Sequence, residues 1–114
     1  MSAAAASFEL TAGPFRLVAG ADGRLAAAGP LTFTSARRAR QLGLEALNGT
    51  AGQQPLEIDC QGVTAADSAG LAVLLDWLGV AKANGRSLRY LHLPAGLVAL
   101  GRISEVTELI ERGV

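Results

Sequence analysis

A carboxylate and a hydroxyl stand side by side at Asp67 and Ser68, immediately before an apolar run with helical spacing. Either side chain can accept a hydrogen bond from a first-turn N–H group, so the pair predicts the N-terminus of a helix. The helix dipole favours negative charge at that end, which makes Ser68 a candidate phosphorylation site. The pattern predicts a docking or switch site rather than a catalytic one.

Arrangements that could support catalysis or metal binding are incomplete. Ser68, His92 and Asp67 formally supply a nucleophile, a base and an acid, but no Gly-x-Ser-x-Gly elbow surrounds the serine. His92 alternates with two leucines, which places it on a strand face. One histidine and one cysteine cannot build a tetrahedral metal site, and the glycine motifs that bind phosphate or dinucleotides are missing. We therefore expect a non-catalytic protein with no cofactor and no metal.

The composition indicates one globular domain. The chain has 114 residues, of which 50% are apolar and 18% charged, and this is enough for a single layered core. Ten basic and ten acidic side chains cancel, so we expect neither nucleic acid nor an anionic membrane as a partner. The lone Cys60 excludes an intrachain disulfide and fits a reducing compartment. Because no apolar run reaches about 18 residues, we expect a cytoplasmic chain. We also expect a disordered start at 1–7 and a single domain at 8–114.

A strand should lead to the acid–hydroxyl pair. Leu56, Ile58 and Cys60 alternate with polar residues in a period of two, and Gly62 then opens a loop of small residues. The apolar run that follows predicts a helix at about 68–83, ended by an Asn-Gly pair. A strand, a short loop and a helix would therefore present the hydroxyl.

The remaining elements alternate in type along the chain. Turn residues at 20–23 join two short strands into a hairpin, and Gly29-Pro30 should break the second strand. A helix capped by Thr32 or Thr34 should follow. The further expected elements are strands at 15–18, 23–27 and 87–93, and helices ending near 47, starting at 94, and running from 104 to about 112. The order β-β-α-β-α-β-α-α predicts an α/β fold, with a mixed sheet of about four strands and helices mainly on one face.

The helix at 68–83 is apolar almost all round. One apolar stripe should face the sheet, and a second stripe of Val73, Trp77 and Val80 lies on another side. Because a small domain can hardly bury both, we expect the second stripe to be an exposed patch with Trp77 as its aromatic anchor. The alternative is that Trp77 covers the edge of the core. The predicted core comprises Leu56, Ile58, Cys60, Leu71, Leu74, Leu75, Leu78, Leu88, Tyr90 and Leu97.

The order of elements, with the sequence Asp-Ser-Ala-Gly-Leu at 67–71 after a strand, resembles the STAS family over about residues 14–112. STAS domains occur in anti-sigma-factor antagonists, in the tails of sulfate transporters and as a subunit of the Mla phospholipid ABC transporter. The resemblance implies a STAS-type fold and a protein-binding module. In the antagonists the hydroxyl that matches Ser68 is phosphorylated by a partner kinase, which switches binding off. In the Mla subunit the matching hydroxyl lies at the interface with the ATPase subunit.

Other segments resemble the Mla-type branch, namely Gly29–Phe33, Gly85–Tyr90 and Leu93–Leu100, while Gly101–Glu105 departs from it. This resemblance implies a subunit that binds and stabilises or regulates the ATPase of a phospholipid transporter that maintains outer-membrane lipid asymmetry. It would be peripheral to the inner membrane through its partner, without inserting into the membrane itself. The alternative is an antagonist of an anti-sigma serine kinase, switched by phosphorylation of Ser68. The residues expected on one exposed, partner-binding face are Thr64, Asp67, Ser68, Ala69, Val73, Trp77 and Arg102.

Overall fold

The computed structural model describes residues 14–20, 24–49 and 55–114, so the expected disordered start lies outside the described residues. Within them, four strands form one sheet in the order β1-β2-β3-β4. β1 is antiparallel to β2, whereas the β2–β3 and β3–β4 pairs are parallel. The strands are β1 (Arg16–Ala19), β2 (Leu25–Leu31), β3 (Leu56–Ala66) and β4 (Leu88–Leu91), and the helices are α2 (Ala36–Gly49), α3 (Ser68–Ala83), α4 (Ala95–Ile103) and α5 (Thr107–Arg112).

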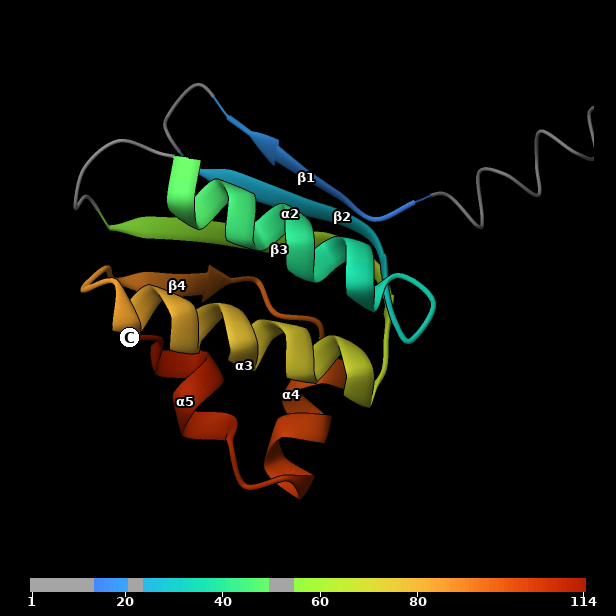
Figure 1. Ribbon diagram of the computed structural model, residues 1–114. Helices are drawn as coiled ribbons and strands as arrows, with labels where there is room; N and C mark the ends of the chain where they lie inside the picture. The colour runs from blue at the N-terminus through green and yellow to red at the C-terminus, as the bar shows by residue number, and fades with distance from the viewer. Residues whose placement is uncertain (1–13, 21–23, 50–54) are drawn as a thin grey trace, which may run out of the picture.

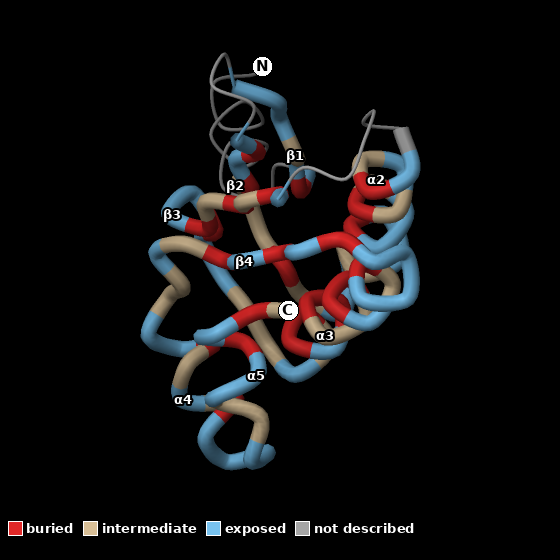
Figure 2. Tube along the Cα trace, turned by 90° about the vertical axis from the view of Figure 1, so that its left-hand side faces the viewer, coloured by how far each residue is buried: buried red, intermediate tan, exposed pale blue. Residues whose placement is uncertain are grey.

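The helices are placed as the alternation of elements predicts. Figure 1 shows α2 and α3 side by side across the sheet, and the view turned by 90° in Figure 2 places both on the same face of it. α4 and α5 lie beside the β4 end of the sheet, where α5 packs against β4 and α4 packs against α3. This arrangement confirms the predicted α/β fold with a mixed sheet and helices mainly on one face.

Two strands run further than predicted. β2 continues through Gly29 and Pro30 to Leu31, and β3 continues past Gly62 to Ala66, so the predicted strand break and loop are both wrong. The register of the β2–β3 pair shifts between Ala26 and Ala28 and again between Gly29 and Pro30. Such irregularities let a strand carry a proline and small residues without losing its neighbour. The longer strands bring the start of α3 directly over the end of β2.

The second apolar stripe of α3 packs into the core, with Val73 and Trp77 buried and Val80 half-buried, which corrects the expected exposed patch. Trp77 is 0% and Val73 5% exposed. α2 packs along this side of α3, and Gly43 in α2 leaves the space that the Trp77 ring fills. The indole N–H donates to the carbonyl oxygen of Arg40 at 3.3 Å, and the ring lies 6.2 Å from that of Phe15. A helix covered by the sheet on one side and by a second helix on another can be apolar on both.

The rest of the core follows the sequence pattern closely. All predicted core residues are buried except Leu75, which is partly buried. The hydroxyl of Tyr90 donates to the carbonyl oxygen of Leu74 at 2.6 Å, which satisfies the one polar group that this ring brings inside. Phe15 just before β1, Leu31 of β2 and Ile110 of α5 also belong to the core.

Cys60 should be unreactive in the folded protein. Burial raises the pKa of its thiol to about 12, so the thiolate that attacks alkylating reagents is almost absent near neutral pH. We expect iodoacetamide at about pH 8 to modify Cys60 only after unfolding, when the pKa returns to about 8.5. Mass spectrometry with and without denaturant measures this, and rapid labelling of the native chain would contradict the buried position.

Candidate functional site

Asp67 links the start of α3 to the β2–α2 loop, at the end of the sheet where β2 and β3 finish. It is the N-cap of α3: its Oδ1 accepts a hydrogen bond from the Gly70 N–H at 3.1 Å. Its Oδ2 accepts a second bond from the Phe33 N–H at 2.9 Å, across 34 residues of sequence. The sequence left open which side chain of the acid–hydroxyl pair caps the helix, and the structure assigns that role to Asp67.

Ser68 is the first residue of α3 and is exposed. Within the described part of the chain its hydroxyl has no hydrogen-bond partner, since the cap is made by its neighbour. Ala69 beside it is half-buried, and Thr64 is exposed at the second register shift of β3, where the pairing passes from Val63 to Ala65. Thr64, Asp67, Ser68 and Ala69 all lie within the six residues that run from the end of β3 to the first turn of α3, and this set is called the Ser68 surface below.

A close contact fixes the Ser68 surface against the β2–α2 loop. A Cβ on Gly70 would collide with the carbonyl oxygen of Leu31, so only glycine lets α3 start this close to the end of β2. In the loop, Ser35 Oγ donates to the Pro30 carbonyl at 2.7 Å and accepts from the Thr32 N–H at 2.9 Å. The helix then begins at Ala36, so the predicted cap at Thr32 or Thr34 is wrong.

Phe33, at the tip of this loop, is a residue that sequence reasoning missed. It is 80% exposed, although its backbone is held by Asp67. The sequence did contain a signal for an exposed Phe33: it is a single large apolar side chain between threonines and a serine, and no neighbouring apolar pattern would bury it. The tie to Asp67 is a tertiary contact that no local pattern carries.

The other predicted members of the partner-binding face lie elsewhere. Val73 and Trp77 are in the core, so they cannot form part of an exposed face. Arg102 is exposed, in the last turn of α4, an element that packs against α3. Along α3, the exposed residues that follow Ser68 are Ala72, Gly79, Lys82 and Ala83.

The backbone donors around Asp67 lower the pKa of its carboxyl group, with the Phe33 N–H as the largest cause and the Gly70 N–H also contributing. Asp67→Ala should therefore remove both the helix cap and the loop tie, and lower the free energy of unfolding by about 1–2 kcal/mol at neutral pH. The contribution is fully present above the unfolded pKa of about 4 and is lost as pH falls through the lowered folded pKa.

Urea unfolding of the wild-type and variant chains at several pH values tests this expectation. The difference between them should shrink in acid, and Asp67→Asn, which keeps an acceptor at the cap, should fall between the two at neutral pH. Equal urea midpoints for wild type and Asp67→Ala at neutral pH would contradict the assigned role.

The formal catalytic triad does not assemble. His92 directly follows β4, in a left-handed conformation with φ 55°, and its Nδ1 lies 3.0 Å from Asp59 Oδ1. The Asp67 carboxylate is occupied by backbone N–H groups. In the described residues, therefore, Ser68 has neither a base nor an acid bonded to it.

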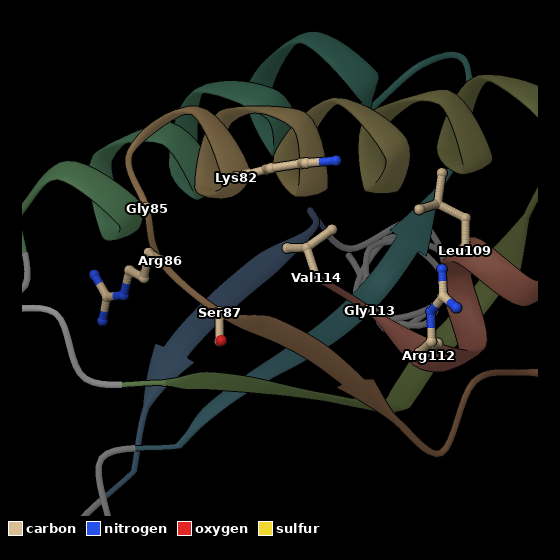
Figure 3. Close-up of a pocket in the computed structure, with 8 residues that line it drawn as sticks. All are labelled: Lys82, Gly85, Arg86, Ser87, Leu109, Arg112, Gly113 and Val114. Carbon is tan, nitrogen blue, oxygen red and sulfur yellow. The ribbon is translucent and has the colours of Figure 1, made fainter.

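A hollow lies near the end of α3 that is opposite to Ser68. The hollow, of about 560 Å³, is shown in Figure 3 and is lined by Lys82, Gly85, Arg86, Ser87, Leu109, Arg112, Gly113 and Val114. Lys82 and Arg112 belong to the last turns of α3 and α5, and Arg86 donates to the Leu47 carbonyl near the end of α2 at 3.2 Å. Cations are favoured at helix C-termini, so the fold itself accounts for the charge of this hollow.

The chain belongs to the STAS domain family. The family model that matches is described as the Mlab STAS domain, and it covers residues 18–111. No curated protein sequence matches the chain significantly.

Solved structures show the same fold at low sequence identity. The anti-sigma factor antagonist SpoIIAA, in its unphosphorylated form, is 14% identical with a TM-score of 0.59, over 85% of this chain and 84% of its own. A sulfate transporter family protein from Wolinella succinogenes is 16% identical with a TM-score of 0.60, over 78% of this chain and 70% of its own. At these identities the similarity establishes the STAS fold and leaves the partner open.

Proposed function

We propose that this chain is a non-catalytic STAS subunit that binds the ATPase subunit of a phospholipid ABC transporter and stabilises or regulates it. The observation that carries the proposal is the exposed, unbonded Ser68 hydroxyl on a helix start held in place by Asp67. The Mlab description of the matching family model favours this branch.

The proposed contact surface consists of Thr64, Asp67, Ser68 and Ala69, with Arg102 from α4. Short side chains at a helix start let a partner approach the backbone closely. The neighbouring β2–α2 loop is already held by Asp67 before any partner binds. A preordered surface loses little conformational entropy when the partner binds. Asp67, whose oxygens accept backbone N–H groups, acts in this proposal by holding the surface rather than by direct contact.

On this proposal the chain is placed at the inner membrane through its partner. Among the described residues there is no helix whose length and apolar content would let it cross a bilayer. In this proposal the subunit acts on the transporter through its ATPase and has no nucleotide site of its own.

The alternative is an anti-sigma-factor antagonist whose binding is switched by phosphorylation of Ser68. The fold similarity to SpoIIAA and the exposed hydroxyl both favour it. A phosphate at the first residue of α3 would face the positive end of the helix dipole.

Copurification from the native host tests the two candidates. Recovery with an ABC ATPase and a membrane permease is the expected result, whereas recovery with a small serine kinase of the anti-sigma type would replace it with the alternative. Turnover of a nucleotide or an ester by the purified chain would refute both. Mass spectrometry of the recovered chain should find Ser68 unmodified.

A further inference from the structure

We propose that Phe33 is the aromatic anchor of the partner-binding surface, that Asp67 positions it, and that it fits an acidic protein surface with an apolar socket. This inference rests on the proposed function, in which the partner covers the neighbouring Ser68. It gives Phe33 the role that the sequence pattern suggested for Trp77.

The first support is the exposure and rigid attachment of Phe33. Its side chain is 80% exposed, yet its N–H is bonded to Asp67 and its loop is closed by the two bonds of Ser35. Large aromatic side chains dominate binding energy when a partner pocket covers them. Since the backbone is already ordered, little is lost in holding the ring at the interface.

The second support is charge. Arg37 and Arg38 follow the loop in the first turn of α2 and are exposed, and that turn contains no acidic residue. Neither arginine is paired with a carboxylate in the described residues, whereas Arg40 one turn on is paired with Asp76. Positive charge at a helix N-terminus opposes the helix dipole, so the isolated fold gains nothing from these two residues. Carboxylates on a partner would complement them.

A protein surface fits these features better than a lipid surface. Two arginines near an anionic membrane contribute about 1 kcal/mol each, and a single aromatic ring adds too little for stable attachment. The chain as a whole has a formal net charge of zero, which gives no wider attraction to lipid headgroups.

The test measures binding of the full chain to the purified ATPase subunit and, separately, to the anti-sigma kinase. Phe33→Ala should weaken binding about thirtyfold while leaving the thermal midpoint unchanged. Val18→Thr is the control for loss of an exposed apolar side chain, because Val18 is 53% exposed on β1, away from the proposed surface, and its replacement should leave the affinity unchanged.

Joint replacement of Arg37 and Arg38 by alanine should slow association with the partner, and added salt should remove the difference from wild type. Arg89→Ala, at the exposed residue of β4, should change neither the association rate nor its dependence on salt.

The outcomes separate this inference from the function it rests on. Loss of ATPase binding in Ser68→Arg with normal binding in Phe33→Ala would overturn the anchor and leave the proposed function in place. Phe33-dependent binding to the kinase alone would support the anchor and overturn the transporter role. Binding of the wild type to neither protein overturns both. Phe33-dependent sedimentation with phosphatidylglycerol vesicles would overturn the choice of a protein as occupant.

Discussion

Trp77→Ala should lower the free energy of unfolding by about 3–5 kcal/mol, because it leaves a cavity between α2 and α3. The ring is fully buried, contacts Phe15, and donates to the Arg40 carbonyl, so no part of it is available to a partner. Urea or thermal unfolding of the purified variant measures the loss. A variant of wild-type stability that fails to bind its partner would restore the earlier interpretation of Trp77 as an exposed anchor.

A pair of glycine variants tests the same packing from the α2 side. Gly43→Ala would place a Cβ into the Trp77 ring, so we expect a loss of about 1–3 kcal/mol from overpacking. Gly79→Ala is the matched control within a helix, because its Cβ would meet nothing within 4 Å. Alanine there should raise stability by up to about 1 kcal/mol through helix propensity. Equal effects of the two substitutions would contradict the close contact of α2 and α3.

The sequence predicted the elements well because their signals are local. Alternation at Leu56, Ile58 and Cys60 identified β3, and the Asp67-Ser68 pair located the start of α3. Helical spacing also gave the correct face of α3 toward the sheet, with Leu74 fully buried. Each of these depends on residues within a few positions of one another.

The errors arise from contacts between distant segments. Spacing shows that Trp77 lies on a different side from Leu74, but it cannot show that Gly43 opens a space for the ring in another helix. Likewise, Gly29-Pro30 is a break signal in isolation, and only pairing with β3 reveals that β2 continues through it. The loop of Phe33 was missed for the same reason, since its tie to Asp67 spans 34 residues.

On the proposed function, Ser68→Arg and Ser68→Asp should each abolish binding to the ATPase subunit, weakening it by about a hundredfold or more. Either substitution places a charged side chain in a contact that now holds a small, neutral one, and an unpaired charge buried at an interface is strongly unfavourable. Ser68→Asp should leave the isolated fold intact, because the helix N-terminus favours an acid. Ser68→Ala should be close to wild type in stability, since Asp67 provides the cap.

Ser87→Asp is the control for Ser68→Asp, because Ser87 is also an exposed serine but lies beside the hollow at the opposite end of α3 (Figure 3). Isothermal titration with the purified ATPase subunit, alongside thermal unfolding of each variant, compares the two positions directly. Ser87→Asp should bind as wild type does, which separates a local effect at the Ser68 surface from a change in total charge. If Ser68→Asp also binds normally, the partner does not cover the start of α3, and the exposed hydroxyl has no role in the contact.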